Sequence, residues 1–209
     1  MSLTTSARHR RQADATGGVA GNERLTAMTG AILLVLFAAE GVTLLRLHQL
    51  LTLHFFLGML LLGPVALKIA STGYRFARYY TGAAPYVRKG PPAPVMRLLG
   101  PLVMASSLAV LGTGVLLAVV GPGADQPWLF LHKASFIGWF GVMTVHVLVY
   151  APRLPRLLLG RQGGEARTGA ARTGAVLAGR GTRWLLLAGS LACGLLLALA
   201  TLHTTAPWH

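Results

Sequence analysis

The chain alternates long apolar stretches with short polar ones. Five apolar stretches are long enough to cross a bilayer as α-helices, at residues 25–46, 51–70, 98–120, 128–150 and 184–202. A span of about 20 apolar residues crosses a hydrocarbon core roughly 30 Å thick. We therefore expect an all-α integral membrane protein. Its first four spans, joined by short connections, form a transmembrane four-helix bundle, and a fifth C-terminal transmembrane helix follows.

The polar stretches divide the chain into four parts. Residues 1–24 are a basic tail that we expect to be disordered on the cytoplasmic side, and residues 25–155 form the four-helix core. Residues 156–183 repeat the letters ARTG and are rich in glycine, which predicts a flexible basic linker. Residues 184–209 contain the fifth span and a short outer tail.

The placement of charge predicts the orientation. The formal net charge is +14, yet 54% of the residues are hydrophobic and the mean hydropathy is +0.59. The basic residues lie mostly in the N-terminal tail and in residues 71–97 and 152–183, which the positive-inside rule assigns to the cytoplasm. We expect a multi-pass protein of the plasma membrane lipid bilayer with a cytoplasmic N-terminus. The same placement argues against nucleic acid as a partner. A single cysteine, Cys193, excludes an intramolecular disulfide and a thiolate cluster.

The fourth apolar stretch carries two histidines, His132 and His146. They are 14 residues apart, which on an α-helix is about 21 Å of rise and about 320° of rotation. Both imidazoles therefore point from nearly one face, with Trp139 halfway between them. Ionisable groups inside a span are costly and usually face a bundle interior. Two histidines so placed predict a helix that can hold two haem irons at different depths.

His54, on the second span, is the expected partner of His132. The second and fourth spans run in the same direction, and each histidine lies near the outer start of its span. The two could bind one haem iron from opposite faces, as axial histidines do in b-type electron carriers. Gly58, one turn further along, would let a macrocycle approach the backbone. The alternative is a pair of buried histidines that are hydrogen-bonded to carbonyls or water.

The inner half of the bundle lacks a matching histidine. The position on the second span at the depth of His146 is Lys68. His146 could hold a second haem with Lys68 or another partner, or it could hydrogen-bond to Ser106 or Ser107. Lys68 could instead extend to the cytoplasmic headgroups. We expect one haem b and leave a second, inner haem open.

Glu40 and Trp139 are further candidates at this cofactor site. Glu40, on the first span, lies near the depth of His54. It could accept a bond from the imidazole and fix its tautomer, or pair with Arg46, or be buried in a protonated or paired form. Trp139 could bridge two redox centres, although core packing is the commoner role of such a residue.

The histidine pattern resembles that of a known group of proteins. His132 and His146 in H-x13-H spacing, beside His54 of the second span, resemble the bacterial membrane cytochrome b group, which includes the cytochrome b-561 type and ferric-reductase-like haem proteins. The resemblance covers about residues 25–155. It implies that His54 and His132 are the outer ligand pair and that His146 is an inner ligand. The chain departs from the di-haem pattern at Lys68, where that pattern has a fourth histidine.

No familiar nucleotide-binding or flavin-binding motif occurs, so electrons would have to arrive from elsewhere. We expect a membrane b-type cytochrome, the membrane subunit of a larger redox system, served by a soluble or membrane redox partner or by quinone. Two alternatives stay open. One is a haem-free transporter or proton relay that uses Glu40, Lys68 and His146. The other is a structural membrane scaffold. The sequence does not predict the oligomeric state.

Overall fold

The structure is a computed structural model that describes residues 3–90, 94–122, 125–150, 152 and 180–208. Every element in these ranges is helical. The long helices are α1 (Leu3–Leu44), α2 (Leu47–Tyr80), α4 (Pro94–Val120), α5 (Asp125–Tyr150) and α8 (Arg180–Thr201). The short ones are α3 (Ala84–Lys89) and the 3-10 helix η3 (Leu202–Trp208). The all-α prediction is confirmed for this part of the chain. Most of the expected linker falls on residues 153–179, outside the described residues.

Four helical segments in the described ranges are long and apolar enough to cross a membrane. They are Gly18–Leu44, Leu47–Tyr80, Arg97–Val120 and Arg180–Trp208, which is consistent with a multi-pass membrane protein. The predicted span at 128–150 is not among them. It forms a helix of sufficient length, α5 with 26 residues. Its side chains His132, Lys133 and His146 lower the hydropathy, because charged and strongly polar groups are the residues least compatible with hydrocarbon.

The N-terminal part is helical, which differs from the disorder expected for residues 1–24. Helix α1 begins at Leu3 and continues without a break into the first apolar span. Its contacts with α2 help to explain why residues near the span are ordered. Val19 is buried, and the Asn22 side chain donates a hydrogen bond to the backbone carbonyl of Ser71, 3.0 Å away. Composition alone does not reveal such a contact between distant segments.

The expected connection at residues 71–97 is also more ordered than predicted. Helix α2 continues through it to Tyr80, and the short helix α3 follows. Glu23 of α1 holds both elements, since its carboxylate lies 3.2 Å from the Arg75 guanidinium and also pairs with the Lys89 ammonium. The three helices are thereby joined at one end of the molecule.

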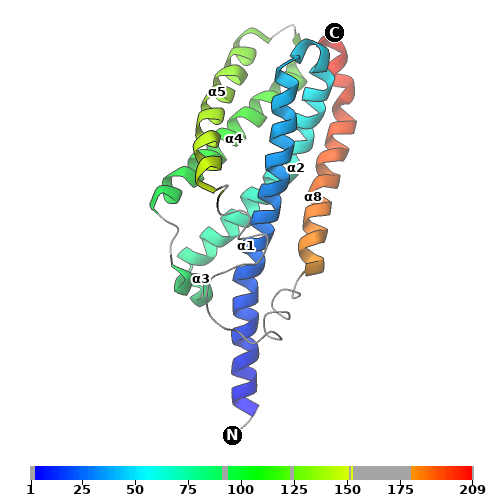
Figure 1. Cartoon of the computed structure of the whole chain (residues 1–209). Coiled ribbons are helices and arrows are strands. Elements are labelled where there is room, and N and C mark those ends of the chain that lie inside the picture. The colour runs from blue at the N-terminus through cyan, green and yellow to red at the C-terminus, as the bar shows by residue number, and fades with distance from the viewer. Residues whose placement is uncertain (1–2, 91–93, 123–124, 151, 153–179, 209) are drawn as a thin grey trace.

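The long helices form two groups. Helices α1, α2 and α8 lie side by side, while α4 crosses at an angle and carries α5 along its flank (Figure 1). Helix α2 packs closely against α1 and α8 and meets α4 over a smaller area. Successive long helices run in opposite directions, so that the start of α1 and the end of η3 lie at opposite ends of the molecule (Figure 1).

Two glycines set the close approach of α2 and α8. A Cβ atom on Gly63 would overlap the backbone carbonyl of Ser190, and one on Gly194 would overlap the carbonyl of Leu60. Small residues permit this kind of backbone contact between membrane helices, where dispersion contacts rather than hydrophobic exclusion drive association. Ala198 of α8 is almost fully buried in a cluster with Met59 of α2, whereas Leu61 of α2 is buried on the side of Leu33 of α1.

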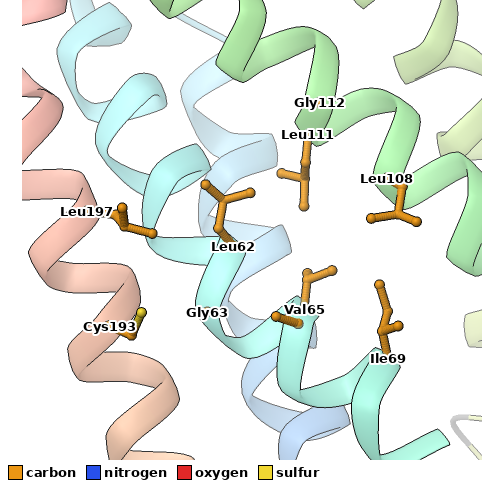
Figure 2. A pocket seen from close by; sticks show the side chains of 10 residues that line it. Leu62, Gly63, Val65, Ile69, Leu108, Leu111, Gly112, Cys193 and Leu197 are labelled. Carbon is orange, nitrogen blue, oxygen red and sulfur yellow. The ribbon is translucent and has the colours of Figure 1, made fainter. Parts of the chain in front are cut away.

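An apolar cavity of about 400 Å³ opens between α2, α4 and α8 (Figure 2). Leu62 and Val65 of α2 face Leu108 and Leu111 of α4 across it, and Cys193 of α8 borders one side. The lining side chains offer no charged group that would orient a polar ligand. The cavity therefore lacks the polar side chains that a binding site for a polar ligand needs.

The glycine contact leads to a prediction about stability. We expect Gly194→Ala to lower the free energy of unfolding by about 1–3 kcal/mol, because its methyl group would force α8 away from α2. Gly189→Ala is the matched control on the same helix, since a Cβ there meets nothing within 4 Å. Thermal unfolding in detergent measures both variants. Equal midpoints would show that α8 does not pack on α2 through Gly194.

Candidate functional site

His54 and His132 meet in the structure. Each lies seven residues into its helix, since α2 begins at Leu47 and α5 at Asp125. Both helices run in the same direction (Figure 1), so equal distances from their starts give similar depths. The two ring centroids are 6.5 Å apart, and the ring planes are inclined by 75°. The predicted proximity of these histidines is confirmed.

Hydrogen bonds at His54 indicate its tautomer. The Thr43 hydroxyl donates its proton to the backbone carbonyl of Glu40, 2.5 Å away. The same hydroxyl oxygen lies 2.9 Å from His54 Nδ1, so it can only accept a bond there. Glu40 Oε1 is also 2.9 Å from Nδ1. Two acceptors thus surround Nδ1, which favours the proton on Nδ1 and leaves the lone pair on Nε2. His54 and Arg46 were both considered as partners of Glu40, and the structure shows the contact with the His54 imidazole.

His132 has a matching arrangement on the other helix pair. Thr113 of α4 donates its hydroxyl proton to the carbonyl of Ala109, 2.8 Å away, and its oxygen lies 3.0 Å from His132 Nδ1. Ser135 donates to the His132 carbonyl and lies 3.2 Å from the Thr113 oxygen. The hydroxyl of Thr113 again acts as an acceptor toward Nδ1. With the Thr113 proton on the Ala109 carbonyl, the lone pair of His132 is on Nε2.

Glycines leave room at the site. A Cβ on Gly114 of α4 would lie 3.2 Å from His132 Cε1, closer than most such contacts, so the glycine admits the imidazole. A Cβ on Gly58 would lie 3.7 Å from Glu40 Oε1, which is an ordinary contact. A methyl group at 114 would require the His132 imidazole to shift by a few tenths of an ångström, whereas one at 58 would make an ordinary contact.

Sequence reasoning missed Thr43, Thr113 and Gly114. The two threonines lie in apolar helices at the level of the histidines and complete their hydrogen bonding. A signal was present, because a hydroxyl in a span can bond to a side chain of a neighbouring helix. That signal is weak, since threonine is common in membrane helices and usually bonds to its own backbone.

At the other end of the bundle, Lys68 is held by α1. Its ammonium donates to the backbone carbonyl of Thr26, 2.6 Å away, and a Cβ on Gly30 would come within 2.9 Å of its nitrogen. Lys68 therefore points into the contact with α1, close to the start of the first apolar span.

Trp139 is a packing residue in this structure. Its ring is buried, with the centroid 4.7 Å from that of Phe37 on α1. Its indole nitrogen donates to the Ser107 hydroxyl on α4, 3.0 Å away. Trp139 thereby links α5 to both α1 and α4, and the packing interpretation of this residue is supported by its contacts.

No protein-family model, curated protein or solved structure matches this chain. Within the described ranges, no group of three or more histidine, cysteine, aspartate or glutamate residues could hold a metal ion. What the structure contributes is a pair of facing histidines, each with Nδ1 next to a hydroxyl acceptor.

The contact of Trp139 gives a second prediction. We expect Ser107→Ala to lower the free energy of unfolding by about 1–3 kcal/mol, because it leaves a buried indole N–H without an acceptor. Ser106→Ala is the control, since the hydroxyl of Ser106 donates to the carbonyl of Val103 on its own helix. Chemical unfolding followed by tryptophan fluorescence compares them. If the two serines prove equivalent, Trp139 does not tie α5 to α4.

Proposed function

We propose that this protein is a membrane b-type cytochrome that binds one haem b between α2 and α5. His54 and His132 would be the axial ligands. The observation that carries the proposal is that the two imidazole rings lie with their centroids 6.5 Å apart while the Nδ1 atom of each lies next to a threonine hydroxyl. Such an arrangement leaves both Nε2 atoms available to a metal.

The separation of the rings fits a shared iron. Metal–imidazole bonds are about 2 Å long and a ring nitrogen lies about 1 Å from the ring centre, so two axial imidazoles have centres about 6 Å apart. The observed separation is 6.5 Å. Haem needs only one or two protein ligands, because its macrocycle supplies four nitrogens. A cluster of three ligating side chains is therefore not required for this cofactor.

The neighbours of the histidines have a clear role in this proposal. Glu40 and Thr43 would fix the ring of His54, and Thr113 would fix the ring of His132, as acceptors behind a metal-binding histidine do. Bound haem supplies one-electron transfer. The chain would orient both ligands, exclude water with apolar helices, and place a carboxylate near one ligand only.

The topology is part of the proposal. We infer five crossings, with α5 as the fourth and with a cytoplasmic N-terminus in the plasma membrane. The alternating helix directions support an odd number of membrane crossings, because the start of α1 and the end of η3 lie at opposite ends of the molecule (Figure 1). The polar residues His132 and Ser135 of α5 bond toward α4 rather than outward, which lowers the cost of placing this helix in lipid.

One haem is the simpler assignment. A second haem at His146 would need another partner, since Lys68 is engaged with Thr26 of α1. The electron donor and acceptor would be a soluble or membrane redox partner or a quinone, with this chain as the membrane subunit of a larger redox system. That role is the one expected of the bacterial membrane cytochrome b group.

A haem-free proton relay is the second candidate function. It is favoured by polar side chains at two depths of the bundle, since Glu40 pairs with His54 near one end and Lys68 bonds to Thr26 near the other, and a relay through Glu40, Lys68 and His146 would have to join these two levels. Titratable groups in series inside a bundle can pass protons. A protein that is colourless when haem is abundant but conducts protons in vesicles would support the relay.

The proposal predicts a specific visible spectrum. Purified protein should show a sharp α-band in the reduced-minus-oxidised difference spectrum, and His54→Ala or His132→Ala should abolish it, because each removes an axial ligand. His48→Ala is the matched control, since His48 is exposed and lies on the same helix as His54. Haem measured per polypeptide should be one. A ratio of two, lowered to one by His146→Ala, would establish the inner haem.

The carboxylate near His54 predicts a change of redox potential. Glu40→Gln should raise the midpoint potential by roughly 60 mV, about 1.4 kcal/mol for one electron, because a carboxylate behind the ligand favours the ferric state. Glu23→Gln removes the same charge at the far end, beside Arg75, and should change little. Potentiometric titration followed by absorbance measures both. An unchanged potential in Glu40→Gln would mean that Glu40 does not act on the haem.

A further inference from the structure

The apolar cavity lies half-way along α2, α4 and α8, three helices that are long and apolar enough to cross a membrane (Figure 2). On α4 it is lined by Leu108, which is near the middle of the span Arg97–Val120. On α8 it is bordered by Cys193, near the middle of the span Arg180–Trp208. The middle of a span lies near the midplane of the bilayer, about 15 Å from either edge of the hydrocarbon core. The cavity is therefore surrounded by lipid chains, far from water and headgroups.

The cavity has a closed floor and an open mouth. Gly63 and Val65 of α2 are buried at its floor. Leu108 of α4 and Leu197 of α8, which also line it, are 57% and 41% exposed. The exposed apolar surface of α4 and α8 therefore continues into the cavity. In a bilayer that surface is covered by lipid tails, which are as apolar as leucine.

The lining favours a hydrocarbon chain over water or an empty space. A buried water needs about three hydrogen bonds, and the lining side chains are all hydrocarbon except for the Cys193 thiol. An empty cavity is unfavourable too, because its free-energy cost rises with its volume. An apolar cavity of about 150 Å³ holds a ring of six carbons, so one of this size has room for more than about ten chain carbons.

The shape of the cavity suits a chain that enters from one side of the membrane. Its residues on α2 run from Leu62 to Ile69, which is about 10 Å at 1.5 Å per residue. Ile69 is the end nearer to α3, since α2 continues to Tyr80 and α3 follows. The cavity thus extends from the middle of the span toward the side of α3. A chain whose headgroup lies on that side reaches the cavity with its terminal part.

We propose that this cavity is a binding site for one acyl chain of a membrane phospholipid, from the leaflet on the side of α3. The chain would fill the space between α4 and the pair α2 and α8. Helix α4 needs such support, because α2 meets it over a smaller area than it meets α1 or α8. The lipid would thereby hold in place the helix that carries Thr113, the partner of His132. The proposal requires that these helices cross a bilayer, and it does not depend on haem.

The test fills the cavity with a side chain of the protein. A Cβ on Gly112 meets nothing within 4 Å, so Gly112→Leu would occupy the space of the lipid chain without a steric conflict at its first atom. Gly100→Leu is the matched control, because Gly100 is on the same helix, is equally open and does not line the cavity. The proteins are reconstituted in phosphatidylglycerol, extracted with detergent and analysed by native mass spectrometry. The wild type and Gly100→Leu should retain a bound phospholipid, and Gly112→Leu should lose it.

Three results would overturn the site. Equal retention of phospholipid by all three proteins would show that the lipid binds elsewhere. A quinone bound in place of the phospholipid would show that the cavity takes an isoprenoid tail. A dimer without lipid would show that a second copy of the chain covers the mouth.

A second measurement does not depend on the folding of Gly112→Leu. Cys193 is the single cysteine of the chain and is exposed at the edge of the cavity. Phosphatidylglycerol added to delipidated wild type should slow the alkylation of Cys193 by a maleimide, because the bound chain covers the thiol. The control combines Ala192→Cys with Cys193→Ala, since Ala192 is exposed at the same depth and does not line the cavity. Equal slowing at both positions would contradict the site. Haem content in the same samples is a separate readout, so the lipid site and the cytochrome proposal stand or fall independently.

Discussion

Polar groups inside an apolar bundle must find partners within the protein, and this constraint organises the molecule. An imidazole N–H facing hydrocarbon costs several kcal/mol unless an acceptor satisfies it. Thr43 of α1 supplies that acceptor to His54 of α2, and Thr113 of α4 supplies it to His132 of α5. Each bond ties together one antiparallel helix pair. The two pairs then meet where the imidazoles face each other, which is the site on which the proposed function rests.

The sequence predicted the long helices and the meeting of the two histidines well. Apolar length is a strong signal because the bilayer fixes it, and spans that run the same way place residues at equal distances from their starts at equal depth. His54 and His132 satisfied that relation. The contact of Glu40 with His54 also followed from depth, as one of the alternatives considered.

What the sequence could not predict depends on contacts between distant segments. The helical start of α1 and the order of α3 involve Glu23, whose partner Arg75 is 52 residues away. The direction of Lys68 depends on Thr26 and Gly30 of another helix. When a helix is apolar on all sides, its sequence does not show which side chains face which neighbouring helix. The threonine partners of the two histidines could therefore be identified only from the structure.

Electron paramagnetic resonance of the oxidised protein at low temperature tests the central claim most directly. Bis-imidazole ligation by His54 and His132, with ring planes inclined by 75°, predicts the strongly anisotropic low-spin ferric signal that crossed axial imidazoles give. Replacement of either histidine should convert it to a high-spin signal or remove it. A high-spin ferric signal in the wild type, or no haem signal from protein made with ample haem, would contradict the account.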